Sequence, residues 1–246
     1  IDSSNYQPTI VKPNGEVLDL GYTIESVKFK SNNNVLVGWM LKSKTKSPQT
    51  TLLHFHGNAG SIVDQHRALV PLLDKGFQVF VFDYSGFGFS EGKATRENVL
   101  IDGNSALKYL VTREDIKNTK LVIYGQSLGG HLAAVVGEKN QAIIDGIVIE
   151  GAFSSHKDIG KERAGFLGEL FIKEQYSALK SIQKIYKPVL IIHSSEDEVI
   201  PFKLGKKLYD YANEPKDFFE ISGCHICGPS LFPNEIASKI NKMLNL

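Results

Sequence analysis

Cysteine is scarce in this chain. Only two of its 246 residues are cysteine, Cys224 and Cys227, and they stand three positions apart. Two such neighbours cannot build the multi-bridge framework that holds small secreted domains together. The scarcity therefore excludes a disulfide-stabilised scaffold and mildly favours a reducing compartment.

The chain also lacks a dominant charge and long apolar runs. Its 28 basic and 27 acidic residues leave a formal net charge of +1, and no dense Lys/Arg face is visible. The short basic cluster over residues 42–46 alternates with Ser and Thr and is typical of a solvated turn. No apolar run reaches the roughly 18 residues that a bilayer span needs. We therefore expect no nucleic-acid partner, and membrane association only through sequence upstream of residue 1.

The first residue, Ile1, is not a methionine. We expect that upstream sequence has been removed, and that a signal or an anchor could have been lost with it. The compartment is therefore left open, with the cytoplasm slightly favoured by the low cysteine content.

Short apolar segments are plentiful, and they alternate with helical patterns from residue 51 onward. Residues 22–30 and 35–42 first predict an antiparallel hairpin, after an irregular lead-in over residues 1–20. Further strands are expected at residues 51–56, 77–83, 120–124, 143–150, 188–193 and 217–221, and helices at residues 61–73, 98–111, 128–138, 202–211 and 233–244. This alternation predicts an α/β fold with a mostly parallel sheet and helices on both faces. The length suits one domain over residues 1–246.

The longest interruption of this pattern runs from Gly151 to Lys187. It contains seven large apolar or aromatic residues: Phe153, Phe166, Leu167, Leu170, Phe171, Ile172 and Tyr176. An insertion at the strand ends, where ligands bind in such sheets, predicts a short lid or substrate wall. It is too short for a full cap domain.

The most informative motif is the G-x-S-x-G pattern from Gly125 to Gly129. It stands between an expected strand and an expected helix, and Ser127 is its central residue. A serine in such a sharp strand-to-helix turn needs neighbours without side chains, and its hydroxyl is presented as a nucleophile. A glycine-rich nucleotide-binding turn is the alternative, but G-x-G-x-x-G and G-K-[ST] are both absent.

A nucleophilic serine needs a base to take its proton and an acid to orient that base. In this type of sheet the acid follows a later strand, and three acids compete there: Glu196, Asp197 and Glu198. Of these three, Asp197 lies furthest into the turn while still preceding residues 199–201, so we assign it as the acid. Glu150, at the end of the preceding strand, is the other candidate acid.

The base is assigned to His225, the histidine that follows the acid in a loop after the last expected strand. His66, His131 and His156 are expected to be ordinary polar residues. Cys224 and Cys227 flank His225, and a C-x-x-C pair can be redox-active or half of a zinc site. Since no second C-x-x-C exists, we interpret both cysteines as bystanders.

The loop that follows residues 51–56 supplies the remaining part of a reaction site. Its glycines, Gly57 and Gly60, leave backbone N–H groups free to face a reacting carbonyl. We expect the Asn58 N–H and the Leu128 N–H to form an oxyanion hole. His54 and His56 share a strand face, but no further metal-ligand motif accompanies them, so no metal and no cofactor are expected.

Taken together, these segments resemble the α/β-hydrolase superfamily from about residue 51 onward. The resemblance is to α/β-hydrolase-domain serine hydrolases with an H-G-N-A motif, and it rests on residues 56–59, 82–90, 124–129 and 195–200. It implies an eight-stranded sheet and a Ser-Asp-His triad, in a group that includes esterases, lipid hydrolases and protein-depalmitoylating thioesterases. Two positions depart from the pattern: Ser85, where many relatives have arginine, and Cys224, where Gly or Ala usually precedes the base.

The predicted function is hydrolysis of carboxylic esters or thioesters with an acyl-type substrate, through Ser127, His225 and Asp197. A serine peptidase or amidase ranks lower, because no amine-binding pocket or additional propeller is visible. A non-catalytic binding protein is the alternative from another class, although all three triad positions have candidates.

Overall fold

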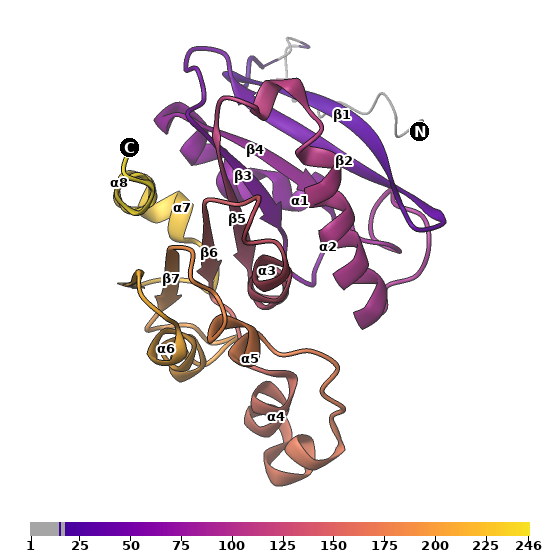
Figure 1. Ribbon diagram of the computed structural model, residues 1–246, viewed down its shortest axis with the longest axis vertical. Helices are drawn as coiled ribbons and strands as arrows, with labels where there is room; N and C mark the ends of the chain where they lie inside the picture. The colour runs from indigo at the N-terminus through magenta and orange to yellow at the C-terminus, as the bar shows by residue number, and fades with distance from the viewer. Residues whose placement is uncertain (1–14, 16–17) are drawn as a thin grey trace.

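The computed structural model describes residue 15 and residues 18–246, so most of the expected lead-in lies outside the described residues. Its centre is an eight-stranded sheet with the strand order β1-β2-β4-β3-β5-β6-β7-β8 (Figure 1). The strands are β1 (Tyr22–Ser31), β2 (Asn34–Ser43), β3 (Thr50–Phe55), β4 (Phe77–Phe82), β5 (Lys120–Gln126), β6 (Gly146–Glu150), β7 (Val189–Ser194) and β8 (Lys216–Ile221). Strand β2 pairs antiparallel with β1 and β4, and all the other pairings are parallel. The predicted eight-stranded, mostly parallel sheet is confirmed.

Both faces of the sheet are covered, because successive side chains of each strand enter different cores. In β3, Leu53 and Phe55 belong to one core and Leu52 to the other. The first core packs against α2 (Arg96–Leu110), α3 (Leu128–Lys139), α5 (Ala178–Ile182) and α6 (Phe202–Tyr211). The second core packs against η1 (His66–Lys75) and α8 (Pro233–Leu244). The short elements α1 (Ile62–Gln65), η2 (Glu114–Ile116) and α7 (Gly228–Leu231) connect these layers.

The prediction of one α-helix over residues 61–73 is wrong in the type of helix. Ser61 caps a single turn, α1, and the chain then continues as the 3₁₀-helix η1 up to Lys75. Pro71 lies inside this segment. Because proline has no N–H and clashes with the preceding turn, a regular α-helix cannot run through it.

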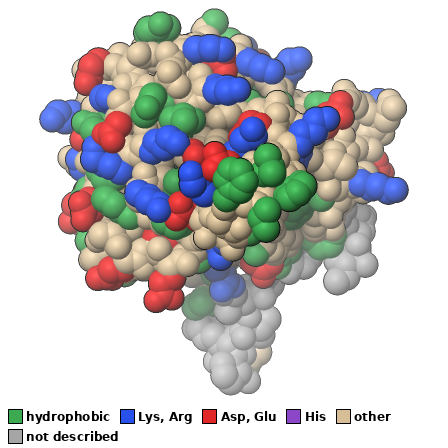
Figure 2. Space-filling view, turned by 90° about the horizontal axis from the view of Figure 1, so that it is seen from below, with side chains coloured by type: hydrophobic (Ala, Val, Ile, Leu, Met, Phe, Trp, Pro, Cys, Tyr) green, Lys and Arg blue, Asp and Glu red, His purple; other side chains and the backbone are tan. Residues whose placement is uncertain are grey.

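The expected lid (residues 151–187) folds into α4 (His156–Phe171) and α5. Helix α4 projects from the sheet at the lower end of the molecule (Figure 1) and is interrupted at Ala164 and Gly165, where φ of the glycine is 60°. After this kink, four large apolar residues are exposed: Phe166, Leu167, Leu170 and Phe171. Seen from that end, hydrophobic side chains gather among Lys and Arg side chains (Figure 2).

Among the described residues, none of the helices combines the length and the hydrophobicity of a membrane span.

Candidate active site

Ser127 stands in a strained turn between β5 and α3. Its φ of 56° and ψ of −117° are costly for a residue with a side chain. The turn is held by the Ser127 N–H, which donates to the Glu150 carbonyl at 2.9 Å. It is possible only because the chain closes tightly around two glycines. A Cβ on Gly125 would come within 2.2 Å of the Gly129 carbonyl oxygen, and one on Gly129 within 1.9 Å of the Phe55 carbonyl oxygen.

A cavity of about 410 Å³ opens beside Ser127 at the carboxyl ends of the strands. This volume is within the usual range for small-molecule sites. Its wall combines the loops after β3 and β4, the starts of α2 and α3, and the lid segment. The lining residues are Asn58, Phe87, Ala94, Thr95, Arg96, Val99, Ser127, Leu128, Phe153, His156, Ile159, Tyr176 and Ile200.

The two residues predicted to form an oxyanion hole both line this cavity together with Ser127. Leu128 is the first residue of α3, so its N–H has no partner within the helix. Within the described part of the chain, no group accepts a hydrogen bond from the Asn58 N–H. The Asn58 loop approaches the nucleophile closely, because a Cβ on Gly57 would lie 3.6 Å from Ser127 Cβ. Two free donors therefore flank the serine.

Asp197 and His225, which are 28 positions apart, lie in direct contact. His225 Nδ1 donates to Asp197 Oδ2 at 2.6 Å, and Asp197 Oδ1 accepts from the N–H groups of Val199 and Ile200, each at 2.8 Å. Burial alone would raise the pKa of Asp197. Hydrogen bonds from His193, His225 and the Ile200 N–H outweigh burial and hold the pKa of this carboxyl well below its usual range. Asp197 is thus a fixed anion behind the imidazole.

The other ring nitrogen of His225, Nε2, is buried and has no hydrogen-bond partner among the described residues. The imidazole packs against the end of β6, since a Cβ on Gly151 would lie 3.2 Å from His225 Cε1. Gly151 directly follows Glu150, whose carbonyl holds the Ser127 N–H. His225 thus packs beside the segment that holds the Ser127 N–H, and no hydrogen bond joins His225 to Ser127. Catalytic hydrogen bonds are often long or absent in unliganded sites.

Glu150, the alternative acid of the sequence analysis, makes no contact with the imidazole nitrogens. Its fully buried carboxylate accepts from Tyr124 Oη (2.9 Å), Gln126 Nε2 (2.7 Å) and the Gly228 N–H (2.8 Å). Burial raises the pKa of Glu150. Gln126 Nε2 also donates to the Ile226 carbonyl at 3.3 Å. Glu150 and Gln126 thus anchor the loop that carries His225. We missed this role because sequence order cannot show which buried groups face each other.

Comparisons with known proteins identify the family of this fold. The alpha/beta hydrolase fold family model matches residues 50–169. The chain is 36% identical over 213 residues to the uncharacterized protein YfhR of Escherichia coli O157:H7, covering 83% of this chain and 74% of YfhR. It is 34% identical over 186 residues to protein bem46 of Schizosaccharomyces pombe, covering 72% of this chain and 62% of bem46. The chain belongs to the α/β-hydrolase family.

Solved structures share the fold of this α/β-hydrolase at low sequence identity. The Pyrococcus furiosus esterase Pf2001 superposes with a TM-score of 0.73 at 21% identity, over 97% of each chain. Est1E from Butyrivibrio proteoclasticus, solved with ferulic acid bound, gives a TM-score of 0.71 at 15% identity, over 89% of this chain and 98% of that one. At these identities the likeness establishes the common fold.

His54 of β3 and His56 of the following loop both make hydrogen bonds inside this α/β-hydrolase. His54 Nε2 donates to Gln126 Oε1 at 3.0 Å, and His56 Nδ1 donates to the Gly57 carbonyl at 2.7 Å. Burial lowers the pKa of His54 to about 3 and that of His56 to about 4, so both rings are neutral near pH 7. His56 thus has a structural hydrogen-bonding role in this loop.

The two departures from the family pattern are also accommodated. Ser85 donates through its N–H and its hydroxyl to the buried carboxylate of Asp102, at 2.7 and 3.1 Å. The cysteines beside the base are both free, and Cys227 Sγ donates to the Cys224 carbonyl at 3.0 Å. Burial raises the pKa of the Cys227 thiol to about 12, whereas reactive cysteines have a lowered pKa.

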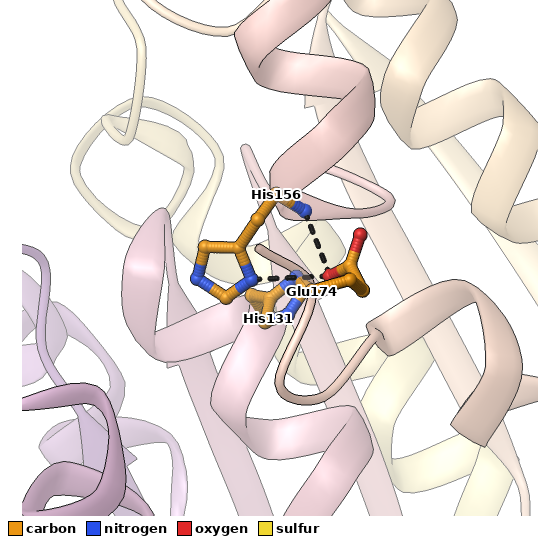
Figure 3. Close-up of side chains that lie close together, drawn as sticks. All are labelled: His131, His156 and Glu174. Carbon is orange, nitrogen blue, oxygen red and sulfur yellow. Dashed lines mark hydrogen bonds and ion pairs between the residues drawn. The ribbon is translucent and has the colours of Figure 1, made fainter. Parts of the chain in front are cut away.

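One cluster of possible metal ligands lies beside the cavity: His131, His156 and Glu174 (Figure 3). Their ligand atoms all lie within 4.8 Å of one another. Glu174 Oε1 already accepts from the backbone N–H and Nδ1 of His156, both at 3.2 Å, and Oε2 accepts from the Lys157 N–H at 3.2 Å. We therefore interpret the cluster as a hydrogen-bonded cavity wall.

Most of the apolar residues that were expected to line the cavity from the lid segment do not line it. Phe153 and Tyr176 do face it, but Phe166, Leu167, Leu170 and Phe171 are exposed. His156, interpreted from the sequence as an ordinary polar residue, and Arg96 of α2 were missed as lining residues. No motif marks them, because their position depends on how the lid folds back over the strand ends.

Proposed function

We propose that this α/β-hydrolase is a serine hydrolase that cleaves carboxylic esters or thioesters. The observation that carries the proposal is the 2.6 Å contact between Asp197 and His225, whose free Nε2 belongs to an imidazole packed against Gly151, next to the Glu150 carbonyl that holds Ser127. An imidazole that is oriented by a buried anion and has a vacant nitrogen is what a serine needs as a general base. The esterases among the structural neighbours are consistent with this chemistry.

The reaction follows from these positions. His225 Nε2 takes the proton of Ser127 Oγ as the oxygen attacks the substrate carbonyl, and Asp197 stabilises the imidazolium. The N–H groups of Asn58 and Leu128 stabilise the oxyanion. The imidazolium then gives its proton to the departing alcohol or thiol, which leaves Ser127 acylated. Water, activated by the same imidazole, releases the acid and restores the serine.

The mainly apolar cavity favours an acyl group over a peptide substrate. Seven of its lining residues are apolar: Phe87, Ala94, Val99, Leu128, Phe153, Ile159 and Ile200. A lining without a carboxylate also offers no counter-ion for the amino terminus of a peptide. A peptidase or amidase is thus the weaker candidate.

Hydrolysis of p-nitrophenyl esters of increasing chain length, an acyl-CoA and an aminoacyl anilide tests the proposal in wild type and in Ser127→Ala. We expect turnover of at least one ester or thioester and little of the anilide. The variant should lose at least about 10³-fold in kcat. Wild-type protein that turns over neither the esters nor the acyl-CoA thioester, or a variant that keeps the activity, would refute the proposal. Turnover of the anilide above the esters would favour an amidase.

A further inference from the structure

The ionisable side chains of the cavity stand on two facing elements. Arg96 begins α2, while His156 and Tyr176 belong to the lid segment, and none of the lining residues is an Asp or a Glu. Arg96 is therefore the charged residue of an otherwise neutral lining, since burial and the nearby Arg96 lower the pKa of His156. Its exposed side chain reaches the lid, where Nη1 donates to the Lys173 carbonyl at 2.6 Å.

Most of the hydrogen-bonding capacity of Arg96 is unused. A guanidinium has five N–H donors, and the described residues accept from Arg96 only through that one carbonyl, with no carboxylate paired to it. The arginine of the lid itself differs, because Arg163 donates to the Val199 carbonyl at 2.7 Å and does not line the cavity. Arg96 thus presents an uncompensated positive charge to the space that contains Ser127.

A second donor without an acceptor lies nearby. The hydroxyl of Tyr176 is buried and has no hydrogen-bond partner among the described residues. Burial raises the pKa of Tyr176 to about 12, against the opposing influence of Arg96, so the hydroxyl keeps its proton. A buried hydroxyl without a partner is uncommon in folded proteins, and at a cavity wall it marks a place for a ligand acceptor.

Glu174, an acidic group near these donors, is already engaged. Glu174 does not line the cavity, and its carboxylate is occupied by the two backbone N–H groups and the His156 ring described above (Figure 3). It orients His156 and leaves the donors of Arg96 free. Two unsatisfied donors, a positive charge and no lining carboxylate are the features that recognise a carboxylate.

We infer that this cavity selects esters or thioesters that carry a carboxylate, bound by Arg96 and Tyr176 while Ser127 attacks the ester carbonyl. This inference rests on the proposed serine hydrolase function. The carboxylate can belong to the acyl group, as in half esters of dicarboxylic acids, or to the leaving group. Both sources share the same recognition chemistry.

Matched substrate pairs test the inference and separate the two sources. The acyl pair compares p-nitrophenyl valerate with the mono-p-nitrophenyl esters of succinate, glutarate and adipate. The leaving-group pair compares phenyl butyrate with 4-carboxyphenyl butyrate. In at least one pair, we expect a higher kcat/KM for the anionic substrate at low salt, with the difference mainly in KM.

The variants Arg96→Gln and Tyr176→Phe should lower kcat/KM for the preferred anionic substrate, by about tenfold for Arg96→Gln. The loss on the neutral partner should be clearly smaller than the loss on the anionic substrate. Arg96→Lys should keep part of the preference, because it keeps the charge and loses the planar fork. Arg163→Gln is the matched control, since it removes a lid arginine outside the cavity and should leave the preference unchanged.

A neutral substrate preferred in both pairs would overturn the inference, as would equal losses on anionic and neutral substrates in Arg96→Gln. Either result would leave the serine hydrolase assignment intact. Absence of turnover on every substrate, or activity that survives in Ser127→Ala, would instead contradict the proposed function itself.

Discussion

The two walls of the cavity are held in different ways. The anchored wall comprises Ser127, Asp197 and the loop of His225, and each part is fixed by buried hydrogen bonds at a strand end. The lid wall, formed by residues 151–187, contains the kink of α4 and the exposed apolar residues beyond it. Side chains of other elements hold this wall from outside the sheet, among them Arg96 of α2 on the Lys173 carbonyl and Lys207 of α6 on Asp158. We propose that the chemistry resides on the anchored wall, and that the lid wall together with Arg96 selects the substrate.

The largest expected effect belongs to the anchored wall. Asp197→Asn should keep the shape of the site but remove the anion that orients and stabilises the imidazolium of His225. We expect kcat for an activated ester to fall by about 10³- to 10⁴-fold, with little change in KM. Steady-state kinetics measure this. A loss of less than tenfold would remove Asp197 from the mechanism and return attention to Glu150.

Glu150→Ala tests what holds the base loop. Its removal leaves the Gly228 N–H, Gln126 Nε2 and Tyr124 Oη without their shared acceptor. We expect the free energy of unfolding to fall by about 3 kcal/mol in urea denaturation. The kcat should fall at a pH where the variant is still folded.

The matched control is Glu174→Ala on the lid wall, where the lost acceptor is half-buried and the expected destabilisation is smaller. Equal destabilisation by both variants would contradict the contrast between the walls.

Acid should destabilise the fold through buried histidines that lie beside the two walls. Burial lowers the pKa of His54 to about 3, and burial together with His156 lowers that of His131 to about 3. Between these values and the unfolded pKa of about 6.5, the unfolded state binds more protons. Stability therefore falls as the pH drops below about 6.5, by roughly 2 kcal/mol per histidine between pH 7 and pH 5.

Denaturant titrations of wild type and His131→Gln at the two pH values isolate the share of His131, which belongs to α3 and packs against Phe153 and His156 of the lid wall. The variant should lose less stability on acidification than wild type. An identical pH dependence would show that His131 does not titrate in this way.

The smallest effect is expected on the exposed surface of the lid. Replacing Phe166 and Phe171 by Ser should change the free energy of unfolding by less than about 0.5 kcal/mol for each substitution, because both side chains are already largely exposed to water. Thermal denaturation measures this. A clear destabilisation would mean that these rings are packed in solution and that the lid is more firmly held than the structure shows.

The same contrast explains how much could be predicted from the sequence. The alternation of β3, β4, β5 and β6 with helices fixes a parallel sheet, and a sheet brings its strand ends to one edge. Ser127, Asp197 and His225 could therefore be assigned from local motifs and chain order. The contacts of Glu150 and Gln126 with the base loop depend on side chains from separate strands meeting in the interior.

The lid resisted prediction for a different physical reason. Its apolar residues indicated a substrate wall, but Gly165 turns the second half of α4 away, and Phe166 to Phe171 face the solvent. Lining residues such as Arg96 and His156 carry no periodic or motif signal. The path of such a segment is decided by tertiary packing, which a pattern of residue types does not encode.

The central claim is that Ser127 is a nucleophile activated by His225. The most direct measurement is the intact mass of the protein after reaction with a fluorophosphonate, followed by peptide mapping. We predict one adduct per chain, located on Ser127, fast in wild type, strongly slowed in His225→Ala and absent in Ser127→Ala. An adduct elsewhere, or labelling that persists in Ser127→Ala, would contradict the account.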